Sequence, residues 1–104
     1  MADSRERPGA AVKERVETKP QDPSLFKVVL LNDDYTTMEF VIHVLETIFQ
    51  KSPAEAYRIM MHVHRNGRGI AGIYPWEVAE TKADTVRSLA AEAGFPLRAA
   101  IEEA

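Results

Sequence analysis

An apolar run over residues 26–31 stops abruptly at three consecutive polar residues, Asn32, Asp33 and Asp34. Apolar residues at helical spacing begin a few positions later, at Met38. This switch from strand-like to helix-like patterning predicts a strand-to-helix turn that carries two carboxylates and one amide. Such a turn lies at the rim of a core, where its polar groups can face a ligand. An ordinary turn could carry the same residues, because Asn and Asp side chains hydrogen-bond to their own backbone.

Length and composition exclude several classes of protein. At 104 residues the chain has room for one core only. A net charge of −3 gives no electrostatic basis for binding nucleic acid. Without cysteine there is no disulfide, thiol nucleophile or cysteine-type zinc site. No apolar stretch approaches the roughly 18 residues of a membrane span, and the N-terminus lacks the apolar centre of a secretory signal. We therefore expect a soluble, cytoplasmic monomer that uses no cofactor and binds neither nucleic acid nor membranes.

Residues 1–22 have the composition of a flexible N-terminal extension. They contain Pro8, Gly9 and Pro20, no aromatic residue, and five basic against five acidic side chains. Such a segment cannot bury enough apolar surface to offset its ordering entropy, so we expect it to be mobile. It would serve either as an inert solubilising tail or as a flexible arm that another protein grips.

A folded domain is expected over residues 23–104, and capping patterns mark where its first two helices begin. Thr36 and Glu39 have the spacing of a capping box, which predicts the start of a first helix. Ser52 and Glu55 repeat this spacing, with Pro53 at the first helical position.

The remaining elements are also marked by Gly and Pro. Gly67 and Gly94 suit left-handed caps at the C-terminal ends of the second and third helices, and Pro75 opens the third. Strands are predicted over residues 25–31 and 68–73, and in the alternating set Leu97, Ala99 and Ile101. The third helix has a stripe of mostly small residues: Ala79, Ala83, Val86, Leu89, Ala90 and Ala93. Three strands cannot cover both of their own faces, so we predict an α+β fold with a small three-stranded antiparallel sheet and three helices packed on one face.

Catalysis and metal binding are poorly supported by the residues. Asp33, Asp34 and His64 could supply acid and base, but a nucleophile is missing. His62 and His64 are two residues apart on a predicted helix, so their side chains would point about 200° apart. The turn at Asn32 does not match a calcium loop, because no glutamate follows at the twelfth position. His64 itself could be a core histidine bonded to a backbone carbonyl, or it could face the polar turn.

Four separated motifs nevertheless resemble one family. The chain is similar to ClpS, the adaptor of the ATP-dependent Clp protease, in order and without gaps over residues 24–104. The motifs are Asn32-Asp33-Asp34-Tyr35-Thr36, Met38-Glu39-Phe40-Val41, Val63-His64 and Val78-Ala79-Glu80-Thr81-Lys82. One departure is Thr37, where the family commonly has proline; we expect its absence to loosen the first helical turn slightly.

The resemblance implies an adaptor, not an enzyme, that binds proteins beginning with a bulky hydrophobic residue and delivers them to a ClpA-type unfoldase. By position, Asn32, Asp34 and His64 would hold the substrate's α-amino group, and Asp33 would brace the turn. The side-chain pocket would be lined by Leu30, Thr36, Met38, Val41, Met60, Val63 and Leu97. Glu77 and Lys82 would touch the N-terminal domain of the unfoldase. The alternative is a small interaction domain that docks on a large complex without reading N-termini.

Overall fold

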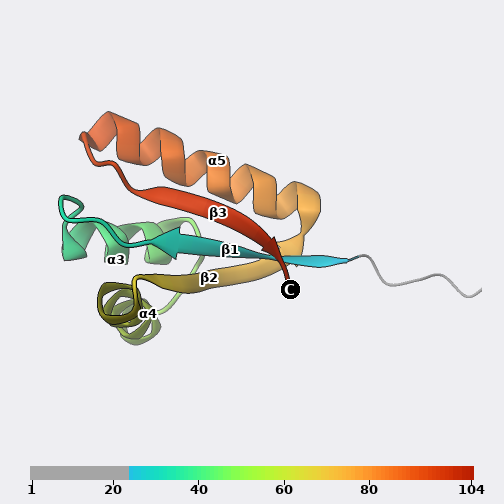
Figure 1. Ribbon diagram of the computed structural model, residues 1–104, viewed down its shortest axis with the longest axis horizontal. Helices are drawn as coiled ribbons and strands as arrows, with labels where there is room; N and C mark the ends of the chain where they lie inside the picture. Colours follow the sequence, from blue (N-terminus) through green and yellow to red (C-terminus); the bar gives the residue numbers. More distant parts are fainter. Residues whose placement is uncertain (1–23) are drawn as a thin grey trace, which may run out of the picture.

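The central feature of the fold is a three-stranded antiparallel sheet in the order β2-β1-β3 (Figure 1). The computed structural model describes residues 24–104, so the extension predicted for residues 1–22 lies outside the described residues. Its elements follow in the order β1 (Leu25–Leu31), α3 (Met38–Thr47), α4 (Pro53–Asn66), β2 (Arg68–Pro75), α5 (Trp76–Ala93) and β3 (Arg98–Glu103). The apolar run of the sequence became the central strand, because Val28, Val29 and Leu30 are fully buried there.

All three helices pack on one face of this sheet. Alternate residues of β1, Val28 and Leu30, join Ala71 of β2 and Ala99 of β3 in a single core with the buried residues of α3, α4 and α5. α4 lies beside the edge strand β2, and α5 runs along β3 (Figure 1). The other face, where Lys27 lies, carries no helix. The predicted fold class is therefore confirmed for residues 24–104.

The small residues of α5 allow it to lie close to its neighbours. Ala79, Ala83, Val86 and Ala90 are buried along one side of this helix. The predicted stripe was too long at its end, because Ala93, in the last turn before the Gly94 cap, is exposed.

The caps at Ser52, Gly67 and Gly94 were predicted correctly, whereas the cap of α3 was not. The capping box predicted for α4 is only half formed among residues 24–104, because the Glu55 carboxylate pairs with Arg58. The Ser52 hydroxyl accepts a hydrogen bond from the Glu55 N–H, and Gly67 and Gly94 end their helices with positive φ. The cap of α3 is Thr37, not Thr36: the Thr37 hydroxyl accepts from the Phe40 N–H at 3.1 Å. Threonine at this position therefore supplies a side-chain cap, which proline could not do.

Candidate functional site

A small pocket of about 220 Å³ lies where the turn after β1 and the start of α3 meet α4. It is lined by Asn32, Asp33, Asp34, Thr36, Met38, Val41, Met60, Val63 and His64. Eight of the ten residues predicted for the amino-group site and the side-chain pocket are therefore brought together, and Asp33 joins them. The other two, Leu30 and Leu97, are buried in the core and do not line the pocket. Its volume is below the roughly 300–1,000 Å³ of sites for drug-sized ligands, so it suits one side chain and not a large cofactor.

The turn is held in shape by the carboxylate of Asp33. One oxygen accepts from the Tyr35 N–H at 2.8 Å and the Thr36 N–H at 2.7 Å, and the other accepts from the Thr36 hydroxyl at 2.7 Å. Burial acts to raise the pKa of Asp33, but these hydrogen bonds and the nearby charge of Arg98 outweigh it and lower the pKa below its ordinary 3.8. The bracing role expected for Asp33 is confirmed. The same contacts turn the Thr36 hydroxyl toward Asp33, and the hydroxyl that accepts from a helix N–H is that of Thr37.

A backbone hydrogen bond connects this turn to the end of α4. The Asn32 N–H donates to the carbonyl of Gly67 at 2.9 Å. Gly67 itself has φ +87°, a left-handed conformation that glycine adopts without a side-chain clash. Because His64 lies three residues before Gly67 on the last turn of α4, this bond fixes the histidine on the same side as the polar turn.

Three polar side chains of the pocket are exposed and unpaired within the described part of the chain. Asn32, Asp34 and His64 make no side-chain hydrogen bond or ion pair to another residue among residues 24–104. His64 is therefore not a core histidine. An amide oxygen, a carboxylate and an imidazole nitrogen facing one small space can accept hydrogen bonds from a cationic group with several donors.

The pocket wall below these groups is apolar. Val41, Met60 and Val63 are buried, with 7%, 3% and 2% of their surface exposed. Met38, the first residue of α3, is 43% exposed and lies at the mouth of the pocket. Thr36 is half-buried between the polar and the apolar parts. The site therefore combines a polar rim with an apolar interior that two flexible methionines help to form.

The structure offers little support for metal binding. Among residues 24–104 there is no cluster of three or more His, Asp or Glu side chains that could hold a metal ion. His62 contacts Asn66, one turn further along α4, and lines two other hollows, not the pocket of His64. Within the same residues, no helix is long and apolar enough to cross a membrane.

The two residues expected to touch an unfoldase have different surroundings. Glu77 is exposed in the first turn of α5. Lys82 is half-buried: its ammonium donates to the Ile48 carbonyl at the end of α3 at 2.6 Å and to the Gln50 side chain at 3.2 Å. Lys82 therefore ties α5 to α3, a structural role that the sequence did not reveal.

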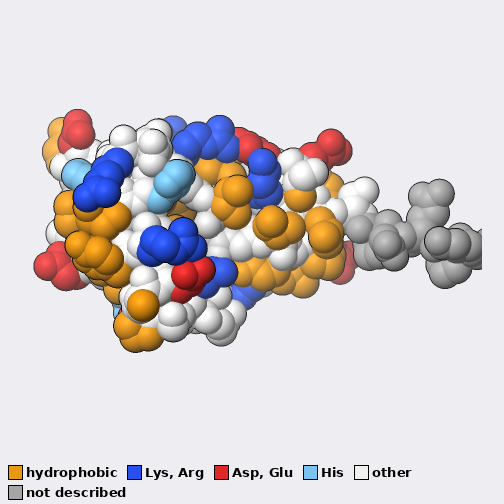
Figure 2. Space-filling model, turned by 90° about the horizontal axis from the view of Figure 1, so that it is seen from below, with side chains coloured by type: hydrophobic (Ala, Val, Ile, Leu, Met, Phe, Trp, Pro, Cys, Tyr) orange, Lys and Arg blue, Asp and Glu red, His pale blue; other side chains and the backbone are white. Residues whose placement is uncertain are grey.

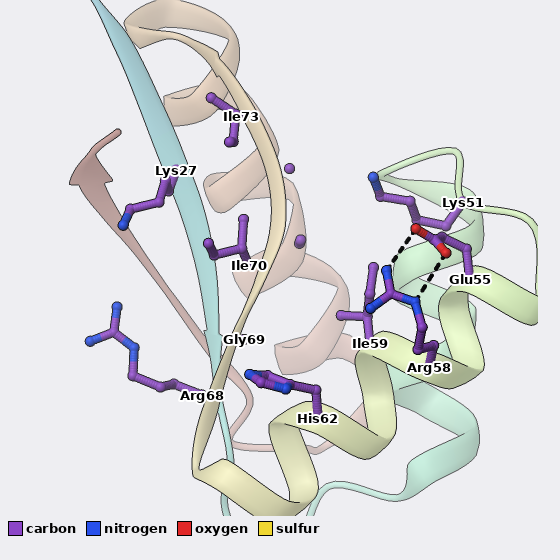
Figure 3. Close-up of a pocket in the computed structure, with 12 residues that line it drawn as sticks. Lys27, Lys51, Glu55, Arg58, Ile59, His62, Arg68, Gly69, Ile70 and Ile73 are labelled. Carbon is purple, nitrogen blue, oxygen red and sulfur yellow. Dashed lines mark hydrogen bonds and ion pairs between the residues drawn. The ribbon is translucent and has the colours of Figure 1, made fainter.

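A second and larger hollow was not anticipated from the sequence. It measures about 710 Å³ and lies between α4 and β2, on the surface that Figure 2 shows and Figure 3 enlarges. None of the predicted site residues lines it. The sequence does contain the cations and isoleucines of β2 and α4 that line it. They form one surface only when the two elements lie side by side.

The chain is similar in sequence to proteins of one family. A protein-family model described as ATP-dependent Clp protease adaptor protein ClpS matches residues 21–100. Among curated proteins, the ATP-dependent Clp protease adapter protein ClpS of Wolinella succinogenes is 57% identical over 82 residues, 79% of this chain and 80% of the relative. The ClpS of Rhodospirillum centenum is 48% identical over 99% of both chains.

A solved structure is similar as well. It is Agrobacterium tumefaciens ClpS2 bound to L-phenylalaninamide, which superposes with a TM-score of 0.77 at 44% identity. The match covers 80% of this chain and 100% of that one. The likeness thus extends over the whole described domain.

The two adjacent aspartates of the turn should differ in their effect on stability. Asp33→Ala removes the acceptor of three hydrogen bonds and should lower the free energy of unfolding by about 1–3 kcal/mol at neutral pH, whereas Asp34→Ala should leave it nearly unchanged. Because the folded-state pKa of Asp33 is depressed, its contribution is complete above its ordinary value of 3.8 and is lost as pH falls through the lower folded-state value. Urea unfolding of the two variants against pH measures this difference. Equal losses for Asp33→Ala and Asp34→Ala would contradict the bracing role.

Proposed function

This chain belongs to the ClpS family of adaptors of the ATP-dependent Clp protease, and we propose that it binds proteins whose first residue is Leu, Phe, Tyr or Trp and delivers them to a ClpA-type unfoldase. It would act in the cytoplasm as an adaptor without catalytic activity of its own. The observation that carries this proposal is the group of three polar side chains, Asn32, Asp34 and His64, which have no side-chain partner among residues 24–104 and lie around an apolar pocket.

The chemistry of these three groups fits a free α-amino group. This group has a pKa of about 7.7–8.0, so it is mostly cationic at neutral pH, and it offers three N–H donors. The Asn32 amide oxygen, the Asp34 carboxylate and a neutral His64 imidazole would supply one acceptor each. Hydrogen bonds to charged groups contribute roughly 1.5–3 kcal/mol each. A blocked, uncharged N-terminus would lose the charge and two of the donors, which gives the site its selectivity.

The apolar interior fits the first side chain of a substrate. Burial of a Leu or Phe side chain contributes roughly 1.5–3 kcal/mol, and Val41, Met60 and Val63 provide the wall. The ligand of the Agrobacterium relative, L-phenylalaninamide, has the matching parts: a free α-amino group, an aromatic side chain and an amide in place of the next peptide bond. After the costs of association, the sum favours reversible binding, as delivery requires.

Delivery requires a second surface, which we assign to the start of α5. Glu77 is exposed there and free to contact the N-terminal domain of the unfoldase. Lys82 has one N–H donor left after its two internal hydrogen bonds, so it would contribute less to docking than to holding α3 in place.

Removal of the Asp34 carboxylate tests the amino-group site. Asp34→Ala should weaken binding of a Leu-initiated peptide by about 2–3 kcal/mol, roughly 30- to 150-fold, because it takes away the one anionic partner of the ammonium. Fluorescence anisotropy with free and N-acetylated forms of the same peptide measures this; acetylation should be as damaging as the mutation. Glu92→Ala, which removes an exposed carboxylate of α5, is the control. Tight binding of the acetylated peptide, or unchanged affinity of a folded Asp34→Ala protein, would refute the site.

Delivery is tested by separating it from peptide binding. Glu77→Ala should bind the Leu-initiated peptide normally but slow the degradation of a Leu-initiated fluorescent substrate by unfoldase, protease and ATP, several-fold if Glu77 is a central contact. Glu80→Ala, an exposed carboxylate one turn further along α5, is the matched control. Degradation at the full rate by Glu77→Ala would place the docking surface elsewhere.

The preference for first residues that are not branched at the β-carbon is assigned to Met38. Its exposed side chain at the pocket mouth would crowd a first residue that is branched at its β-carbon. Met38→Ala should therefore strengthen binding of Ile- and Val-initiated peptides more than it weakens binding of the Leu peptide. Met61→Ala, a methionine of α4 outside the pocket, is the control for loss of a thioether. A variant that loses Leu binding and gains neither Ile nor Val would show that Met38 only packs.

A further inference from the structure

The large hollow between α4 and β2 is a groove along the free edge of the sheet. β2 pairs with β1 on one side, and its other side has no strand partner among residues 24–104. In Figure 3, α4 and the loop before it place Lys51, Glu55, Arg58, Ile59 and His62 on one side of the groove. β2 forms the other side, with Lys27 and Arg68 beyond it on the face of the sheet that carries no helix. A chain lying along the edge of β2 would thus be flanked by cations on both sides.

The groove is basic although the chain is acidic. The residues that line it include four cations, Lys27, Lys51, Arg58 and Arg68, and one anion, Glu55, a formal charge of +3 on a chain of net charge −3. Arg58 is paired with Glu55, and Arg68 reaches across β1 to Glu102 at 2.5 Å. Lys27 and Lys51 have no ion-pair partner among residues 24–104. These two ammonium groups can therefore form ion pairs with the carboxylates of a ligand.

The groove also has apolar contacts to offer. Ile70 and Ile73 of β2 are 45% and 50% exposed, and Ile59 is buried at the base. Figure 2 shows this mixture of basic and apolar side chains on one continuous surface. Each side of the β2 edge combines cations with apolar side chains: Lys27, Arg68, Ile70 and Ile73 lie on the face without helices, and Lys51, Arg58 and Ile59 lie on the α4 side. Side chains alternate between the two faces of an extended peptide, so each face of a bound peptide would meet both cations and an apolar surface.

We propose that this groove binds an extended, acidic segment of a partner protein that carries carboxylates and apolar residues on both of its faces, at a site separate from the amino-group pocket. A second copy of the chain fits less well. Two copies would bring their own cations together.

The test uses the full chain and two labelled peptides as long as β2, which has 8 residues. Both are N-acetylated and C-amidated, so neither presents an α-amino group. One repeats Glu-Glu-Val-Val and the other Lys-Lys-Val-Val, so that each face of the extended peptide carries both charged and apolar side chains. Fluorescence anisotropy should show saturable binding of the Glu peptide alone, which weakens as salt rises from about 50 to 500 mM. Lys27→Gln with Lys51→Gln should weaken it by about tenfold, roughly threefold for each cation.

Two matched controls keep this result separate from the proposed adaptor function. Ser88→Glu lowers the net charge by one, as Lys51→Gln does, but on α5 and away from the groove. It should not change binding of the Glu peptide. Asp34→Ala should leave binding of the acetylated peptide unchanged, whatever it does to Leu-initiated peptides.

Several results would overturn the proposal. No binding of the Glu peptide up to about 1 mM, equal binding of the Lys peptide, or equal losses in Ser88→Glu would each do so. A concentration-dependent dimer that dissociates in Lys27→Gln/Lys51→Gln would assign the groove to self-association instead.

Discussion

The carboxylate of Asp33 is the constraint on which the candidate site depends. By accepting three hydrogen bonds from Tyr35 and Thr36, it satisfies the donors of a turn that would otherwise need external partners. The neighbouring side chains of Asn32 and Asp34 then have no hydrogen-bond partner among residues 24–104. A turn braced from within can present neighbouring polar groups to a ligand at little entropic cost, because their backbone is already fixed.

The opposite wall of the site depends on how α4 ends. Its left-handed Gly67 turns the chain into β2 and offers a carbonyl to the Asn32 N–H. That single bond joins the turn after β1 to the helix that carries Met60, Val63 and His64. Gly69 then passes so close to α4 that an added Cβ would lie 2.7 Å from the Val63 side chain. The site therefore depends on two glycines: Gly67 for its left-handed backbone, and Gly69 for the close approach of β2 to α4.

The helices occupy one face of the sheet, and this leaves the other face and the β2 edge to solvent. Antiparallel sheets commonly have one solvated face. Here that face is only partly polar: Arg68 and Glu102 form an ion pair across β1, and Val29 of β1 is fully buried on that side, whereas Ile70 and Ile73 stay half exposed. The molecule thus has two surfaces of different character, a small neutral-to-acidic pocket near His64 and a basic, apolar groove along β2.

The sequence by itself determined the order of elements, the strand at residues 25–31, the caps at Ser52, Gly67 and Gly94, and eight of the residues that line the small pocket. These follow from local rules, periodicity and capping, or from motifs that resemble a family.

Only the tertiary structure decided the rest. It placed Leu30 and Leu97 in the core and gave Lys82 an internal role at the end of α3. The cap of α3 lies at Thr37 and not at Thr36, whose hydroxyl is turned toward Asp33. It also created the basic groove, because residues as distant as Lys27, Lys51 and Arg68 share a surface only when β2 lies beside both β1 and α4. Local rules describe neighbours along the chain, whereas the groove and the contact between Lys82 and Ile48 join residues that are separated by tens of positions.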